Sequence, residues 1–187
     1  MSINDYEFFN GVVLNKLIRK GKPVKIDIFP SSSNNAFTIN DKIGLYIKYS
    51  KKLVSPWRFG FQKEHQDEFK IMSELCKMSF LILVCNKDGI VCINNKTLKT
   101  ILDDKYDDVE WISASRLKRE SYAIKGSDGK LKFKINLNDF PKHIIRELWN
   151  WSQIDHTKRF NLKINILIIL VYLNFWRSQG ESNPSLQ

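Results

Sequence analysis

The stretch Phe80-Leu-Ile-Leu-Val-Cys85 decides the fold class, because an unbroken apolar run predicts a central strand that is covered on both faces. The turn residues Lys87-Asp88-Gly89 follow it and lead into a second apolar run, Ile90-Val-Cys-Ile93. Just before the run, residues 63–77 have the apolar spacing of an amphipathic helix. A strand that follows a helix and ends in a turn is typical of a sheet with helices packed on it.

Further elements are expected on both sides of this segment. The chain opens with a predicted helix at residues 5–20, and strands are predicted at 24–30, 36–40, 43–50 and 57–61. Downstream, a short helix is predicted at 96–102, and strands at 109–115, 121–124 and 131–135, the last after the hairpin turn Gly126–Gly129. This order predicts an α/β domain, with α+β as the alternative, built on a single mixed β-sheet with flanking helices.

The predicted domain ends near residue 143, and the C-terminal quarter differs from it. Residues 144–176 are predicted to form a helical, apolar extension, in which Ile164–Trp176 is almost wholly apolar. As a helix this run reaches about 20 Å, short of the ~30 Å core of a bilayer, so a buried or interfacial helix is favoured and no membrane span is expected. Residues 177–187 predict a disordered tail. The codons for Gly180–Pro184 can match the complement of a tRNA arm, which suggests translational read-through.

Composition narrows the function classes. The 187 residues include 30 Lys and Arg against 20 Asp and Glu, a net charge of +10 that predicts either attraction to polyanions or only a solvated surface. The three cysteines form no C-x-x-C pair, and the N-terminus lacks a secretory pattern, so a cytoplasmic protein without disulfides or a thiolate zinc site is expected. No G-x-S-x-G, Walker A or G-x-G-x-x-G motif occurs, which argues against serine hydrolases, P-loop NTPases and dinucleotide-binding enzymes.

The basic charge is concentrated between Lys42 and Lys63, a segment without any acidic residue. Its basic residues are Lys42, Lys48, Lys51, Lys52, Arg58 and Lys63, and its aromatic residues are Tyr46, Tyr49, Trp57, Phe59 and Phe61. Phosphates attract the basic residues and exposed bases stack on aromatic rings, so a nucleic-acid site would use Lys51, Lys52, Trp57 and Arg58. Strand alternation favours a second interpretation, in which Tyr49, Trp57, Phe59 and Phe61 belong to the apolar face of a sheet.

The same region resembles a known superfamily. Leu45-Tyr-Ile-Lys-Tyr-Ser50 followed by Trp57-Arg-Phe59, in a helix–strand–hairpin–strand–helix–strand order, resembles the core of the PD-(D/E)xK, restriction-endonuclease-like superfamily over residues 5–94. The runs FFNGVVL, LYIKYSKKLVSPWRF, EHQDE and LVCNKDGIVCI also resemble a family of uncharacterised bacterial proteins.

The resemblance implies a specific chemistry. Such nucleases bind Mg²⁺ with one carboxylate on the hairpin and another two residues before the lysine, which stabilises developing charge. Lys48 matches the lysine, and Asp41 is the expected catalytic and metal-binding carboxylate, with Asp27 as the alternative; Glu7 could add another carboxylate. Tyr46 stands where the second carboxylate is expected, so the motif is incomplete.

The resemblance therefore predicts a nucleic-acid-associated protein, and a Mg²⁺-dependent endonuclease if it is active. The alternative is a non-catalytic protein–protein interaction module, or a subunit of a larger bacterial system.

Two further charged segments have open interpretations. The acidic residues Asp103, Asp104, Asp107, Asp108 and Glu110 could bind a divalent cation, but they lack the order of a calcium loop and a solvated loop is favoured. The basic residues Arg116, Lys118, Arg119 and Lys125 extend the positive surface only if their strands lie beside those of residues 42–63.

Overall fold

The computed structural model describes residues 2–20, 23–103, 105 and 110–150. A compact unit spans Met1–Ile145, so it ends two residues beyond the predicted boundary, and Arg146–Gln187 form a second unit. The apolar run at 164–176 and the predicted tail lie outside the described residues. No helix in the described part of the chain is long and apolar enough to cross a membrane.

A five-stranded mixed sheet forms the centre of the first unit. Its order is β1 (Ile26–Ile28), β2 (Ala36–Ile39), β3 (Ile43–Ser50), β5 (Met78–Cys85) and β6 (Gly89–Asn94). The central strands β3 and β5 pair in parallel, and the other neighbours are antiparallel. Strand β5 contains the apolar run that opened the sequence and is buried at every position from Ser79 to Cys85, as a strand covered on both faces should be.

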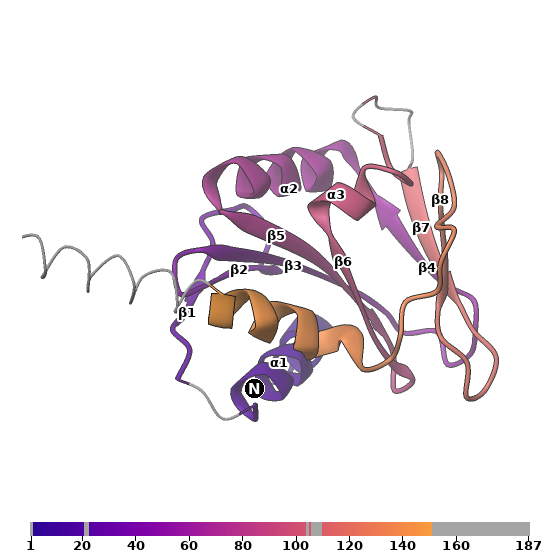
Figure 1. Cartoon of the computed structure of the whole chain (residues 1–187), viewed down its shortest axis with the longest axis horizontal. Helices are drawn as coiled ribbons and strands as arrows, with labels where there is room; N and C mark the ends of the chain where they lie inside the picture. The colour runs from indigo at the N-terminus through magenta and orange to yellow at the C-terminus, as the bar shows by residue number, and fades with distance from the viewer. Residues whose placement is uncertain (1, 21–22, 104, 106–109, 151–187) are drawn as a thin grey trace, which may run out of the picture. The chain divides into compact units, whose positions relative to one another are not determined.

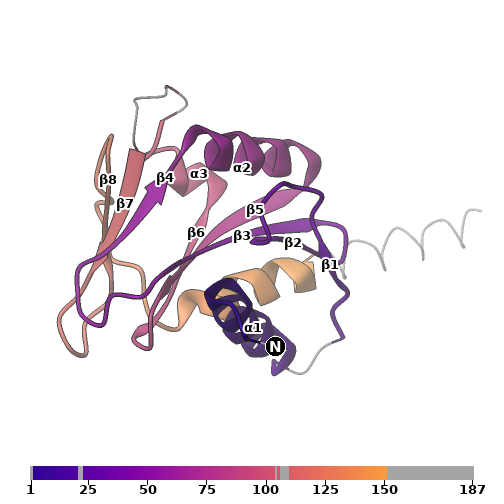
Figure 2. The same cartoon turned by 180° about the vertical axis from the view of Figure 1, so that it is seen from behind.

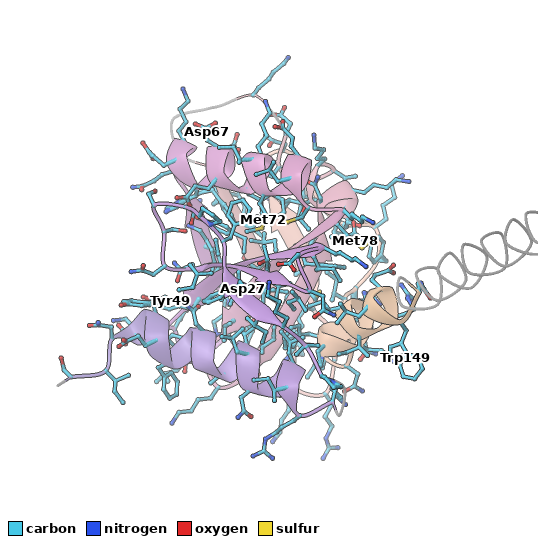
Figure 3. All side chains as sticks on the ribbon, turned by 90° about the vertical axis from the view of Figure 1, so that its left-hand side faces the viewer. Asp27, Tyr49, Asp67, Met72, Met78 and Trp149 are labelled. Carbon is cyan, nitrogen blue, oxygen red and sulfur yellow. The ribbon has the colours of Figure 1, made fainter. Side chains whose placement is uncertain are left out.

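Helices cover both faces of this sheet (Figures 1 and 2). Helix α2 (Lys63–Leu75) lies on one face, while α1 (Asp5–Ile18) and the helical residues 139–145 lie on the other. On the α2 face, a Cβ atom at Gly44 would lie 2.4 Å from the Met72 side chain, so this glycine permits close contact between helix and strand. On the α1 face, the rings of Phe9 and Tyr49 stack 4.5 Å apart, and Figure 3 shows Met72 and Tyr49 on opposite sides of the sheet.

A second, three-stranded antiparallel sheet has the order β4 (Trp57–Phe61), β7 (Glu110–Ser115) and β8 (Ala123–Gly126). The predicted fold class, a mixture of helices and strands in one domain, is confirmed, but the strands form two sheets. Both edges of β3 are occupied, by β2 and β5. Strand β4 therefore cannot form hydrogen bonds with β3 and pairs with β7 instead. The short helix α3 (Asn95–Leu98) connects β6 to the segment before β7.

The predicted strand at 131–135 is wrong. Only two isolated bridges form there, Lys125 with Lys130 and Tyr122 with Ile135. Three residue steps separate Tyr122 from Lys125, whereas five separate Lys130 from Ile135. The two extra residues interrupt the ladder of hydrogen bonds, as in a bulge.

An ion pair joins the two sheets. Arg116, just after β7, donates to both carboxylate oxygens of Asp88 in the β5–β6 turn, at 2.6 and 2.7 Å. The hydroxyl of Tyr122, just before β8, donates to the same carboxylate at 2.5 Å. A Cβ atom at Gly89 would lie 2.6 Å from that hydroxyl, so the turn needs a glycine beside this contact.

We expect Arg116→Ala to lower the free energy of unfolding by about 2 kcal/mol, because it leaves the Asp88 carboxylate without its strongest partner. A fully buried pair would lose more, but 24% of the Asp88 side chain and 12% of the Arg116 side chain are exposed. Urea denaturation measures this change. The control is Lys134→Ala, which removes a half-exposed ion pair with Glu120 and should cost less than about 1 kcal/mol. Equal losses in the two variants would contradict a special role for the Asp88–Arg116 pair.

Candidate nucleic-acid interface

Lys48 lies near the end of β3, on the face covered by α2 and beside the second sheet. Its Nζ atom donates to the carbonyl oxygen of Gly60 at 2.7 Å and lies 2.9 Å from Nδ1 of His65. The same atom lies 4.7 Å from the centre of the Phe61 ring. Contacts from β4 and from the first turn of α2 therefore hold this amine between the two sheets.

The surroundings of Lys48 make its amine easier to deprotonate. Burial lowers the pKa of Lys48 to about 8, and the negative charge of Glu68 partly opposes this change. Burial, and then the charge of Lys48, lower the pKa of His65 as well. The lowered pKa favours the neutral form of His65, whose Nδ1 can accept from Lys48 and from the backbone N–H of Gln62, which lies 3.2 Å away.

Tyr46 stands at the position of the expected second carboxylate, and it donates to a carboxylate on another element. Its hydroxyl lies 2.8 Å from Oε2 of Glu68 in α2, while Oε1 of Glu68 accepts from the Ser32 hydroxyl at 2.5 Å and the Ser33 N–H at 3.0 Å. Burial tends to raise the pKa of Glu68, but these hydrogen bonds outweigh it and the pKa is lowered. The sequence-based prediction missed Glu68, although its spacing of three residues from His65 places both on one helix face.

Lys48 and Arg58 line the same open pocket. The residues that form this basic pocket are Asn35, Lys48, Tyr49, Arg58, Phe59 and Gly60. The lining contains two cationic side chains and no carboxylate, a combination that suits a phosphate group. The structure thus brings together two of the predicted site residues, which lie ten positions apart in the sequence.

Asp41, the predicted catalytic and metal-binding carboxylate, is not in this pocket. It lies in the β2–β3 turn with φ 54°, and both of its oxygens accept from Lys25, at 3.0 and 3.1 Å. Five residue steps of β3 separate Ile43, the first residue of the strand, from Lys48, a distance of about 16 Å. The predicted pairing of Asp41 with Lys48 is therefore wrong, because the two residues stand at opposite ends of one strand.

The alternative carboxylates also have other roles. Asp27 lies 2.9 Å from Lys25, and Glu7 accepts from the Asn4 N–H as part of the capping box of α1. Around Lys48, both oxygens of Glu68 already accept hydrogen bonds from the protein, and Tyr46 is a donor. Mg²⁺ needs oxygen ligands that can turn toward it. The residues beside Lys48 therefore do not fit the metal that the resemblance implies.

The other predicted contacts to nucleic acid are only partly available. Lys51 forms an exposed ion pair with Asp5 at 2.8 Å, and the Lys52 amine donates to the carbonyl oxygen of Pro56 at 2.9 Å. The indole N–H of Trp57 donates to the carbonyl oxygen of Lys52 at 2.8 Å, and the residue is only 2% exposed. Trp57 cannot stack on a base from this position. The alternation of β4 buries it in the core, as the second interpretation of the sequence indicated.

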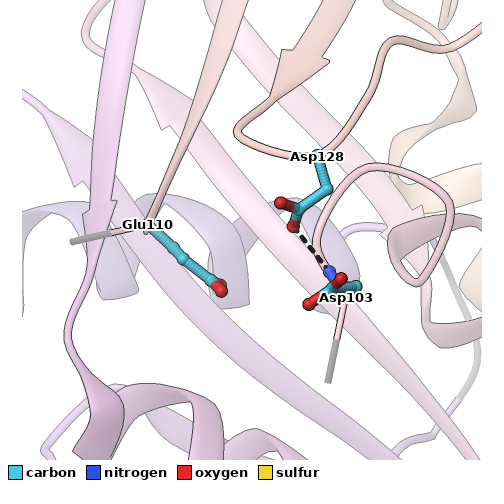
Figure 4. Close-up of side chains that lie close together, drawn as sticks. All are labelled: Asp103, Glu110 and Asp128. Atoms are coloured by element: carbon cyan, nitrogen blue, oxygen red, sulfur yellow. Dashed lines mark hydrogen bonds between the residues drawn. The ribbon is translucent and has the colours of Figure 1, made fainter. Parts of the chain in front are cut away.

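Three carboxylates that could hold a metal ion meet elsewhere in the unit (Figure 4). One oxygen each from Asp103, Glu110 and Asp128 lie within 4.8 Å of one another, and Asp128 also accepts from the Asp103 N–H at 2.8 Å. Glu110 is buried and accepts from the Gln66 amide at 2.5 Å. The sequence indicated Asp103 and Glu110 but not Asp128, which comes from a separate turn. Of the other acidic residues in that run, 104, 107 and 108 lie outside the described part of the chain.

The second basic run does lie beside the first. Strand β7 pairs with β4 and β8 pairs with β7, so Arg58 and Lys125 both lie opposite Ser113 in the register. The Arg58 guanidinium lies over the Trp111 ring at 4.3 Å, and the Lys125 amine lies 5.7 Å from the same ring. Lys125 therefore continues the positive surface from the basic pocket, whereas Arg116 is engaged by Asp88.

No protein-family model matches the chain, and no curated protein or solved structure is significantly similar to it. The function is therefore argued from the geometry of the site.

We expect the Lys48 amine to titrate with a midpoint near pH 8, which NMR of the ¹³C-dimethylated protein would measure. Glu68→Gln removes the negative charge that favours the protonated amine, so the midpoint should move further down. Lys51 is the internal control, because its ion pair with Asp5 raises its pKa above the usual value. A Lys48 midpoint above pH 10 would show that the amine is not buried as described.

Proposed function

We propose that this protein binds nucleic acid, with the phosphate backbone held in the basic pocket by Lys48 and Arg58. The observation that carries the proposal is the convergence of these two cations in a lining without a carboxylate. A phosphate placed there would form charge-assisted hydrogen bonds with the half-buried Lys48 and the exposed Arg58.

Two features favour a nucleic acid over a small anion. The pocket continues onto exposed basic side chains of the second sheet, so more than one phosphate can be contacted. The chain also carries a net charge of +10, which steers polyanions toward it. The observed order α1, β1, β2, β3, β4, α2, β5 is the order on which the resemblance to the PD-(D/E)xK superfamily rests, and it supports the same class of ligand.

The geometry supports binding more strongly than cleavage. Lys48 is in place, but neither Asp41 nor any pair of carboxylates with available oxygens stands beside it among the described residues. This arrangement fits a protein that resembles the PD-(D/E)xK superfamily but has kept the basic site and lost the metal ligands. On this proposal, the interaction with nucleic acid is the function, and strand cleavage is not part of it.

We expect Lys48→Ala and Arg58→Ala each to weaken binding of a short labelled oligonucleotide, measured by fluorescence anisotropy over a series of salt concentrations. Each variant should reduce the slope of log affinity against log salt by about 1, because one phosphate contact is lost. Lys20→Ala is the matched control, since this exposed lysine follows the C-terminal end of α1 and is not among the residues that line the basic pocket.

Two outcomes would overturn the proposal. One is the absence of binding to any oligonucleotide at low salt. The other is an equal effect of Lys20→Ala and the two pocket variants, which would indicate only a diffuse attraction to the net charge.

We also expect labelled single-stranded and duplex DNA to stay intact after long incubation with the protein and Mg²⁺ or Mn²⁺, as judged on a denaturing gel. Cleavage that requires the metal and disappears in Lys48→Ala, while that variant stays folded, would show that an active nuclease site forms after all.

A further inference from the structure

The second sheet has one face that is turned away from the core. Alternation along its strands places Trp57, Phe59 and Phe61 inside and puts a different set of residues outside. The residues of this outer face are Arg58 and Gly60 from β4, Trp111, Ser113 and Ser115 from β7, and Ala123 and Lys125 from β8.

Trp111 is the only aromatic residue among these seven positions, and small residues surround it. It lies opposite Gly60 in the register, and a Cβ atom added at Gly60 would meet nothing within 4 Å. Serine and alanine occupy the other positions that are not cationic. The indole therefore has open space beside it, which a flat group of the size of a nucleic-acid base can enter.

The only charges on the outer face are positive. Arg58 and Lys125 both lie over the Trp111 ring, at 4.3 and 5.7 Å, and both are exposed. Long exposed side chains of this kind can turn from the ring to a phosphate without opening the core. Arg58 also lines the basic pocket, so the outer face and the pocket form one continuous surface.

We infer that the outer face binds single-stranded nucleic acid, with an unpaired base stacked on Trp111 and neighbouring phosphates on Arg58, Lys125 and the basic pocket. This inference rests on the proposed function and specifies its ligand. A single strand has flat bases, which can stack on the Trp111 ring, and negatively charged phosphates, which the cationic side chains attract. In a duplex the bases are stacked on one another and do not reach such a ring.

The test compares three ligands with the same number of phosphates: a thymine single strand, the same strand with abasic sites in place of its bases, and a duplex. The wild-type protein should bind the thymine strand about tenfold more tightly than the abasic strand, since one stacked base supplies that much affinity. This comparison uses the unaltered protein, so it does not depend on how any variant folds.

Variants then assign the effect to the ring. Trp111→Ala should weaken binding of the thymine strand about tenfold and leave the abasic strand unchanged, while Trp111→Phe should restore most of the loss. Phe8→Ala is the matched control, because Phe8 is an aromatic residue on α1 that is 54% exposed and should not affect any of the three ligands.

The outcomes separate this inference from the proposed function. Equal affinity for duplex and single strand, or equal weakening of thymine and abasic strands by Trp111→Ala, would overturn the stacking of a base. Salt-dependent binding that requires Lys48 and Arg58 would then still support the proposed function. If none of the three ligands binds at low salt, both are wrong.

Discussion

The parallel pairing of β3 with β5 is the constraint on which the site depends. With β2 on its other edge, β3 has no edge left for β4, which turns away and begins the second sheet. Lys48, near the end of β3, is thereby left between the two sheets, where the Gly60 carbonyl and His65 can reach its amine. The lowered pKa of this lysine is a consequence of topology, because its amine is partly buried where the two sheets meet.

The position of the second sheet is fixed at points outside the basic pocket. The Asp88–Arg116–Tyr122 contact connects the β5–β6 turn to both ends of the loop that joins β7 to β8. At Gly126 a Cβ atom would lie within bonding distance of the Ile101 carbonyl oxygen, so β8 approaches the backbone after α3 as closely as a glycine allows. Since Lys48 comes from the first sheet and Arg58 from the second, the spacing of these two cations depends on contacts that neither residue makes.

The sequence predicted the bounds of strands far better than it predicted which strands pair and which side chains meet. Strands β3 and β4 have the bounds that alternation indicated, because the two-residue period is visible within a few positions. The division into two sheets was not predictable, since it depends on β4 and β7 meeting across almost fifty residues. The same limit explains the site: Asp41 is close to Lys48 in the sequence but lies at the other end of the strand, whereas Glu68 approaches from a helix that follows later.

The first turn of α2 lies between a positively charged site and a negatively charged one. His65 and Gln66 are consecutive residues in the first turn of α2, and consecutive helical residues point about 100° apart. His65 contacts the Lys48 amine, whereas Gln66 contacts Glu110 of the acidic group with Asp103 and Asp128. A single residue step in α2 therefore separates contact with the basic pocket from contact with the acidic group. If the protein binds nucleic acid as proposed, the basic pocket would attract the polyanion and the acidic group would repel it.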